Sequence, residues 1–350
     1  MKKDKENIPS INPDFLVPSK KRERIDVHSL FAGIKAGSWQ DLSRAITLVE
    51  SQSKKDKELA RQLIHLCLPL SGSSFRIGIT GSPGVGKSTF IESLGLALID
   101  SGHKVAVLAI DPSSSLNHGS ILGDKTRMDR LAIHEHSFIR PSPAGTSLGG
   151  VARTTRESVI LCEAAGFDRI LIETVGVGQS EVTVHSMVDF FLLMLLPGAG
   201  DELQGIKRGV MEMADLIVIN KADDERELLA QKSKRMVQNA LHILPATAKE
   251  WKTPVETISA LKQKNVKRVM QLSNQFFDLV RSNNVFGERR KQQAIYWLDE
   301  YINFQLKNTF FDNPLIYQKY NEIKEIVRDN QLSPFEAADE LFQFFLKSNS

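Results

Sequence analysis

The feature of this sequence that most restricts its fold is the segment GSPGVGKS at residues 81–88, which matches the phosphate-loop pattern G-x-x-x-x-G-K-[ST]. The apolar run RIGIT precedes it, and the helical pattern TFIESLGLALI follows it. A phosphate loop requires this context, because its glycines let backbone N–H groups surround the phosphates and the next helix adds a favourable dipole. The segment therefore predicts a nucleotide-binding fold.

Each position of this loop has an expected role. We expect Lys87 to reach the β- and γ-phosphate oxygens, and Ser88 to ligate a Mg²⁺ ion that accompanies the nucleotide. Lys87 is also an expected catalytic residue, because its charge lies where negative charge develops during phosphoryl transfer. The expected nucleotide-binding residues of this segment are Gly81, Ser82, Pro83, Gly84, Val85, Gly86, Lys87, Ser88 and Thr89.

The sequence around the loop predicts an α/β fold class. Between residues 75 and 261, short apolar runs alternate with helical patterns; the runs are RIGIT, KVAVLAI, RILIET, FFLLMLL and LIVINKAD. Such alternation predicts βαβ units and a mainly parallel, doubly wound sheet that is covered on both faces. We therefore expect a P-loop NTPase domain with helical extensions at both ends.

Changes in pattern along the chain divide it into four expected segments. Residues 1–24 are polar and contain prolines without periodicity, which predicts a disordered tail. Residues 25–71 have apolar positions at helical spacing, and residues 72–262 form the expected nucleotide-binding domain. Residues 263–350 carry amphipathic helical patterns such as QQAIYWLDEYINFQL, and we expect them to form an arm.

Aromatic residues in this expected arm predict self-association. A short helical tail cannot bury this many aromatic rings alone, and exposed apolar patches usually mark an interface. The residues are Tyr296, Trp297, Tyr301, Phe304 and Phe310. We therefore expect a homodimer.

The segment NKAD at residues 220–223 follows the apolar run LIVI and predicts guanine recognition. An Asp carboxylate accepts hydrogen bonds from guanine N1–H and the 2-amino group, which adenine lacks, so an unpaired Asp223 would disfavour ATP. Residues 259–260, Ser-Ala, follow the short strand pattern VETI and can offer a backbone N–H to guanine O6. The expected guanine-binding residues are Asn220, Lys221, Asp223, Ser259 and Ala260. GTP and its product GDP are the expected ligands.

Acidic residues at strand ends predict the metal site. Residues 173–176, ETVG, end the strand RILI and resemble the D-x-x-G element, with Glu in place of Asp. We expect Glu173 to hold Mg²⁺ through a water molecule, and Gly176 to donate its N–H to the γ-phosphate. Asp111 ends the run KVAVLAI, and Asp124 follows in the next loop. Ligands bind at such strand ends in open α/β sheets. A helix cap or a solvated loop position is the alternative for both aspartates.

The expected metal ligands are Ser88, Asp111, Asp124 and Glu173, and the expected catalytic residues are Lys87, Asp124 and Glu173. No glutamine directly follows Gly176, where a fast GTPase has its water-orienting residue. Gln179 is a weak candidate for that role. We therefore expect slow intrinsic hydrolysis, with a partner or a second subunit completing the site.

Composition excludes several function classes. The formal net charge over 350 residues is +3, which gives no bias toward nucleic acid or an anionic membrane. The two cysteines, Cys67 and Cys162, are too few for a disulfide framework or a zinc knuckle. The apolar run at residues 190–197 is far shorter than the roughly 20 residues that cross a bilayer. N-terminal charges of both signs, without an apolar signal core, favour a cytoplasmic location.

Together, the motifs GSPGVGKS, DPSSS, GSILGDKTRM, ETVGVGQSE, PGAGDELQGIK and NKAD resemble those of the MeaB/ArgK family, the GTPases associated with methylmalonyl-CoA mutase. The resemblance extends over roughly residues 25–348. It implies a dimeric, metallochaperone-type GTPase that binds an adenosylcobalamin-dependent acyl-CoA mutase, gates cofactor loading and protects or reactivates the mutase. The residues that it places around the phosphates and Mg²⁺ are Lys87, Ser88, Asp111, Asp124 and Glu173.

The resemblance also implies an additional switch at residues 197–207, which contacts the mutase. Three glycines give this segment conformational freedom, and its polar side chains can form contacts in one state that vanish in another. The expected switch residues are Asp201, Glu202, Gln204 and Lys207. An ordinary loop with a helix cap is the alternative interpretation.

Three other functions are alternatives to this one. A nickel-insertion GTPase would carry a His-rich tract or a Cys/His cluster, and the sequence has neither. A kinase that acts on amino-acid transport binding proteins has no supporting phosphoacceptor signature. A nucleotide-binding scaffold without turnover stays open, as does the choice between methylmalonyl-CoA and isobutyryl-CoA mutases.

Overall fold

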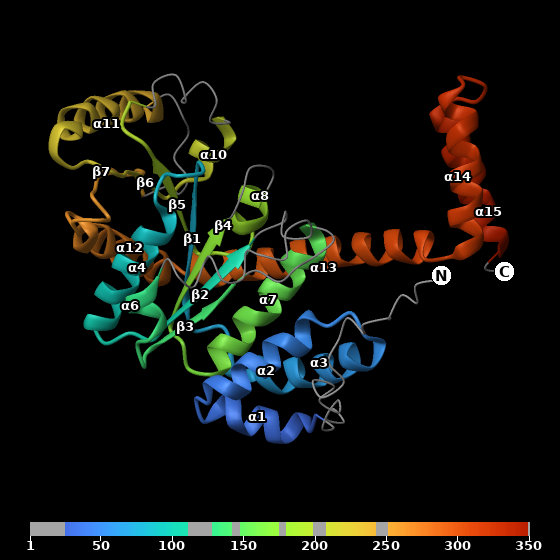
Figure 1. The fold of residues 1–350 in the computed structure, drawn as a ribbon, viewed down its shortest axis with the longest axis horizontal. Coiled ribbons are helices and arrows are strands. Elements are labelled where there is room, and N and C mark those ends of the chain that lie inside the picture. The colour runs from blue at the N-terminus through green and yellow to red at the C-terminus, as the bar shows by residue number, and fades with distance from the viewer. Residues whose placement is uncertain are drawn as a thin grey trace, which may run out of the picture.

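The protein is described by a computed structural model that covers residues 25–110, 128–141, 148–174, 180–198, 208–242 and 251–348. Within these residues, parallel strands form one sheet in the order β3-β2-β4-β1-β5-β6-β7 (Figure 1). The strands are β1 (Phe75–Gly81), β2 (Val105–Ile110), β3 (Ser137–Arg140), β4 (Arg169–Thr174), β5 (Phe190–Leu195), β6 (Leu216–Ile219) and β7 (Val255–Thr257). The predicted α/β class and parallel sheet are confirmed. The short strand β3 was not predicted.

The sheet is buried on both faces, which explains why its strands are nearly continuous apolar runs. Every position of β2 and of β5 is buried. Alternate residues of one strand enter different cores, since side chains alternate across a sheet. Val105 and Val107 belong to one core, whereas Ala106 and Leu108 belong to the other.

Helices cover each face of the sheet (Figure 1). One face carries α4 (Lys87–Asp100), α6 (Asp129–Ala132) and α12 (Val266–Ser282). The other carries α7 (Leu148–Ala164), α8 (Ser180–His185), α10 (Arg208–Met213) and α11 (Glu227–Leu241). The N-terminal helices α1 (Val27–Lys35), α2 (Trp39–Glu50) and α3 (Lys54–Cys67) pack outside α7, so they extend the second core. Short 3₁₀ turns span Leu68–Leu70 (η2) and Asp224–Arg226 (η3).

The C-terminal helices fall into two parts. α12 packs on the sheet with α4 and buries Phe276, so it belongs with the nucleotide-binding domain and not with a projecting arm. α13 (Val285–Phe311) crosses below the sheet and then projects away from it (Figure 1). At its far end, α14 (Pro314–Arg328) and α15 (Pro334–Ser348) form a hairpin with a small core of its own.

The aromatic residues expected to be exposed on the arm divide into two groups. Tyr296 and Tyr301 are exposed, as expected. Trp297, however, is half-buried, and its indole N–H donates to the Ser186 carbonyl at 3.1 Å. Phe310 packs against the hairpin core.

In the part of the chain described here, no helix is both long and apolar enough to span a membrane.

Candidate nucleotide site

The phosphate loop joins β1, the central strand, to the start of α4. Gly84 and Gly86 have positive φ angles of 77° and 95°, which glycine adopts without strain. A Cβ atom at Gly86 would stand 2.7 Å from the Nδ2 atom of Asn220, so this position has no room for a side chain. α4 begins at Lys87 without a side-chain cap, and its first N–H groups therefore suit an anion.

The ammonium group of Lys87 lies inside the concave backbone of this loop. Its Nζ atom donates to the carbonyl oxygens of Gly81 and Ser82, at 2.8 Å and 3.3 Å. Burial lowers the pKa of Lys87, while the negative charges of Glu173 and Glu181 act in the opposite direction. Phosphate oxygens can replace the two carbonyl oxygens as partners, so the geometry fits the expected role of Lys87.

The candidate metal site lies between the phosphate loop and β4. β4 pairs with β1, with Glu173 opposite Ile79, and this pairing brings Glu173 to the start of α4. The Ser88 hydroxyl donates to Glu173 Oε1 at 3.4 Å. Hydroxyl and carboxylate oxygens are ligands that Mg²⁺ prefers, and nucleotide-bound Mg²⁺ needs only one or two from the protein. Ser88 and Glu173 therefore fit a Mg²⁺ site.

The NKAD segment, predicted to bind the base, contacts the phosphate loop. Asn220 Nδ2 donates to the Val85 carbonyl at 2.8 Å, and Asn220 Oδ1 accepts from the Ala260 N–H at 3.0 Å. Lys221 has a positive φ of 59°, and its Nζ donates to the Gly84 carbonyl at 2.8 Å. The side chains of Asn220 and Lys221 therefore link the phosphate loop to the NKAD segment, and Asn220 also links it to the loop that carries Ala260.

Asp223, the carboxylate predicted to bind guanine, has a hydrogen-bond partner in the structure. Asp223 Oδ2 accepts from the Ser259 hydroxyl at 2.8 Å. The backbone amides expected to bind guanine O6 are, however, engaged: Ser259 N–H donates to the Lys264 carbonyl at 3.2 Å, and Ala260 N–H donates to Asn220. Their expected contact with O6 therefore requires that one of these hydrogen bonds be shared or broken.

Several expected site residues lie outside the described residues, and their roles stay predictions. They are Asp111, Asp124, Gly176, Asp201, Glu202, Gln204 and Lys207, together with the weak candidate Gln179. Strand β2, which precedes Asp111, ends at Ile110, and strand β4, which precedes Gly176, ends at Thr174. Ile110 and Thr174 are paired with each other in the sheet. This edge is also the one at which β1 enters the phosphate loop.

Sequence reasoning missed one charged residue of this region. Glu181 lies in the first turn of α8, and its charge acts on the Lys87 ammonium. The signal was present, because Glu181 ends the motif ETVGVGQSE and is acidic at the start of a helical pattern. Sequence alone could not show that this helix packs against β1 and β4, the strands that lead to the phosphate loop and to Glu173.

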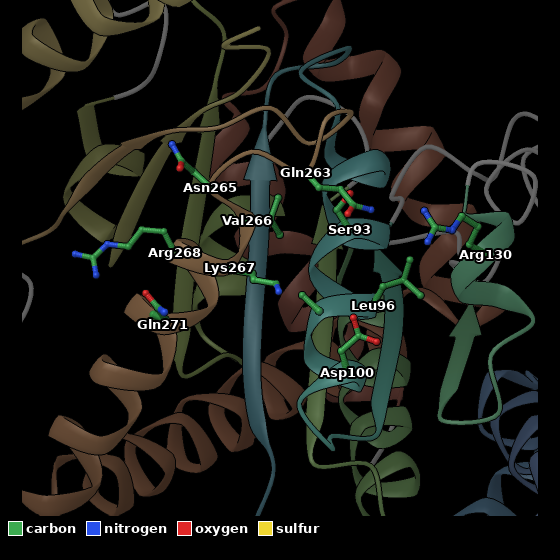
Figure 2. Close-up of a pocket in the computed structure, with 11 residues that line it drawn as sticks. Ser93, Leu96, Asp100, Arg130, Gln263, Asn265, Val266, Lys267, Arg268 and Gln271 are labelled. Atoms are coloured by element: carbon green, nitrogen blue, oxygen red, sulfur yellow. The ribbon is translucent and has the colours of Figure 1, made fainter.

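A crevice of ≈ 410 Å³ lies between α4, α6 and the start of α12 (Figure 2). Lys267 points from α12 toward α4, whereas Arg268 points away from α4. None of the expected nucleotide-binding residues lines this crevice. Among the described residues, no group of three or more His, Cys, Asp or Glu side chains could hold a metal.

Comparisons with known proteins show which family this chain resembles over most of its length. The profile of a family described as methylmalonyl Co-A mutase-associated GTPase MeaB matches residues 42–314. GTPase ArgK of Escherichia coli (strain K12) is 42% identical over 89% of this chain and 94% of that protein. The mitochondrial methylmalonic aciduria type A homolog of Mus musculus is 41% identical over 93% of this chain and 80% of that protein. The crystal structure of a LAO/AO transport system kinase, 36% identical, has a TM-score of 0.74 and covers 91% of this chain and 97% of that one.

Proposed function

This chain belongs to the MeaB family of methylmalonyl-CoA mutase-associated GTPases and is a GTPase, and we propose that it is the chaperone of an adenosylcobalamin-dependent acyl-CoA mutase. In this proposal it gates the loading of the cofactor into the mutase and protects or reactivates that enzyme. A mutase of the methylmalonyl-CoA type is the proposed partner. The family description and the name of the mouse relative support this choice.

One arrangement carries the proposal. The phosphate loop, Glu173 and the NKAD segment converge at one edge of the sheet, with Asn220 hydrogen-bonded to both the phosphate loop and the Ala260 loop. The loops proposed to bind the phosphates and the base are therefore joined by hydrogen bonds of Asn220. Such connection suits a protein whose nucleotide state must be reported to a partner.

We assign the chemistry of hydrolysis to these residues. Lys87 exchanges its carbonyl partners for β- and γ-phosphate oxygens and stabilises the charge that develops there. Mg²⁺, proposed at Ser88 and Glu173 with Asp111 and Asp124 as further ligands, would neutralise phosphate charge when bound. Asp223 selects guanine, since its carboxylate pairs with donors that adenine lacks.

Contact with the mutase is assigned to the segment that carries Asp201, Glu202, Gln204 and Lys207. It follows the buried strand β5 and precedes α10, so it connects two elements of the second core. Homodimerisation through the arm also belongs to the proposal. The exposed side chains of Leu298, Ile302 and Leu306 on α13 support dimerisation, because their burial against a second copy would stabilise the dimer.

A kinase function is the second candidate, because the solved relative at 36% identity is described as a transport system kinase. The two functions differ in the fate of the γ-phosphate, which a GTPase transfers to water and a kinase transfers to protein. With γ-labelled GTP, the proposed function predicts free labelled phosphate only. Label on a protein would favour the kinase.

The mutase partnership is tested by sedimentation of the purified chain with an adenosylcobalamin-dependent methylmalonyl-CoA mutase. We expect a complex whose affinity differs between GDP and a non-hydrolysable GTP analogue, because a switch must bind its partner differently in its two states. Hen lysozyme in place of the mutase is the control. Absence of a complex in both nucleotide states, with isobutyryl-CoA mutase as well, would refute the partnership.

A further inference from the structure

The Ala260 loop, which follows β7 and includes residues 259–264, is a tight turn closed by its own backbone. The Ser259 N–H donates to the Lys264 carbonyl at 3.2 Å, and the Lys264 N–H donates to the Ser259 carbonyl at 3.0 Å. Inside the turn, the Lys262 N–H donates to the Ser259 hydroxyl at 3.2 Å. The Gln263 N–H donates to the Ala260 carbonyl at 3.3 Å. The conformation of the loop is therefore fixed, and most of its N–H groups are engaged.

One backbone donor of the Ala260 loop is available to a ligand. The Ala260 N–H is engaged with Asn220 Oδ1 at 3.0 Å. The Leu261 N–H, by contrast, has no hydrogen-bond acceptor among the described residues. Leu261 is also 78% exposed, so a ligand can reach this position. Because breaking an existing hydrogen bond costs free energy, Leu261 is a better donor for guanine O6 than Ser259 or Ala260.

Ser93 of α4 fixes the orientation of the peptide that carries this donor. Ser93 is buried, and its hydroxyl donates to the Ala260 carbonyl at 2.9 Å. The Ala260 carbonyl and the Leu261 N–H belong to one planar trans peptide, in which they point in opposite directions. The Leu261 N–H therefore points away from Ser93. Rotation of this peptide would break the hydrogen bond from Ser93.

The hydrogen bond of Ser93 differs from those of other buried serines in helices. Ser158 of α7 and Ser273 of α12 donate to carbonyls of their own helices, those of Thr154 and Met270, both at 2.8 Å. Ser93 instead binds a loop 167 residues away in the chain. A serine that only satisfied its own hydroxyl could bond within α4, so the bond to the loop indicates a role in the position of that loop.

Ala260 is held by residues from the other parts of the candidate nucleotide site. Ser93 binds its carbonyl from α4, the helix that begins directly after Gly86 of the phosphate loop. Asn220 binds its N–H and also the Val85 carbonyl in the phosphate loop. The crevice in Figure 2 lies behind this arrangement, since Ser93 and Gln263 both line it. The contacts of Ser93 therefore reach the nucleotide site through hydrogen bonds alone.

We propose that Ser93 is a positioning residue for guanine recognition, which orients the Ala260–Leu261 peptide so that the Leu261 N–H binds guanine O6. The inference rests on the proposed guanine site, to which it adds a donor and the residue that orients this donor. The donor selects purine nucleotides with an acceptor at C6. Guanine has an oxygen there, whereas adenine has an amino group that donates.

The test compares GDP with 6-thio-GDP, in which sulfur, a weak acceptor, replaces O6. Calorimetric titration of the full chain with Mg²⁺ gives both affinities, and we expect the parent chain to bind GDP more tightly. In Ser93→Ala, the affinity for GDP should fall about three- to tenfold, as for one lost hydrogen bond. The affinity for 6-thio-GDP should stay within twofold. Ser93→Thr keeps the hydroxyl and should keep the preference of the parent chain.

Ser273→Ala is the matched control. Ser273 is also buried in a helix on this face of the sheet, but its hydroxyl donates to the Met270 carbonyl of its own helix. The ratio of the two affinities should stay within twofold of the parent value. An equal loss of preference in Ser273→Ala and Ser93→Ala would overturn the proposal, because a general loss of packing would then explain both.

Leu261→Pro removes the proposed donor itself and should also reduce the preference for GDP. Ser93→Ala added to this variant should cause no further loss, since both changes act on one contact. Parent-like preference in either single variant would overturn the proposal, and if one of them fails to fold, the other carries the test. A parent chain that binds GDP and 6-thio-GDP equally would overturn it and leave Asp223 as the guanine contact. A parent chain that does not bind GDP would refute the proposed guanine site as well.

Discussion

At the scale of single residues, the site depends on side chains that serve two loops at once. Asn220 fills the space beside Gly86 and hydrogen-bonds to Val85 and Ala260. A side chain at position 86 would displace it, and the strained positive φ would add to that cost. The phosphate loop and the loop that carries Ala260 therefore form one structural unit.

Asp223→Asn should weaken GTP binding and relax discrimination against xanthine nucleotides. The lost carboxylate was the expected acceptor for guanine N1–H and the 2-amino group, and hydrogen bonds to charged groups contribute about 1.5–3 kcal/mol. Calorimetric titration with GDP and xanthosine diphosphate measures the change. Asp224→Asn is the control, because Asp224 is exposed and pairs with Lys262. Unchanged GDP affinity in Asp223→Asn would contradict the guanine assignment.

At the scale of secondary-structure elements, α8 illustrates how burial sets pH dependence. Burial and the charge of Arg289 lower the pKa of His185 from 6.5 to about 4. The unfolded chain therefore binds a proton at this residue more readily, and His185 reduces stability as pH falls from 6.5 toward 4. Burial raises the pKa of Asp215 to about 6, so the effect of Asp215 on stability has the opposite sign. The stability that protonated Asp215 contributes is lost as the pH rises through 6.

We expect His185→Gln to flatten the loss of stability between pH 6.5 and pH 4. The free energy of unfolding, measured in urea at several pH values, should fall less steeply in the variant than in the parent chain. Asp215 is present in both proteins, so its opposing effect cancels in the comparison. Parallel pH profiles would show that His185 does not titrate with a lowered pKa.

Sequence patterns predicted the elements that depend on local order, and they missed the contacts between distant elements. The phosphate loop, the apolar strands and the NKAD segment have signatures of a few adjacent residues. β3 is short and ends in polar side chains, so it lacks such a signature. The hydrogen bond of the Ala260 amide to Asn220, and the contact of Ser88 with Glu173, follow from packing between segments that are far apart in the chain.

At the scale of the whole molecule, the α14–α15 hairpin stands away from the sheet at the end of α13 (Figure 1). Truncation after residue 262 would remove α12 and its buried Phe276, and would therefore damage the nucleotide-binding domain. Truncation after Trp297 removes the hairpin and the part of α13 that carries the exposed Leu298, Ile302 and Leu306, and it keeps the contact of Trp297 with Ser186. We expect the full chain to sediment as a dimer and this shorter chain as a monomer that still binds GDP. A shorter chain that remained dimeric would refute dimerisation through the arm.

The central claim is that GTP turnover serves a cobalamin-dependent mutase, and one measurement tests it most directly. Steady-state GTP hydrolysis is followed while an adenosylcobalamin-dependent methylmalonyl-CoA mutase is titrated into the chain, with Lys207→Ala run in parallel. We predict that the mutase stimulates the parent chain, and that Lys207→Ala keeps its GTP affinity but is stimulated less, because a coupling residue changes transmission and not the guanine pocket. Equal stimulation of both proteins would remove Lys207 from the coupling. Turnover that does not respond to the mutase in either protein would contradict the claim itself.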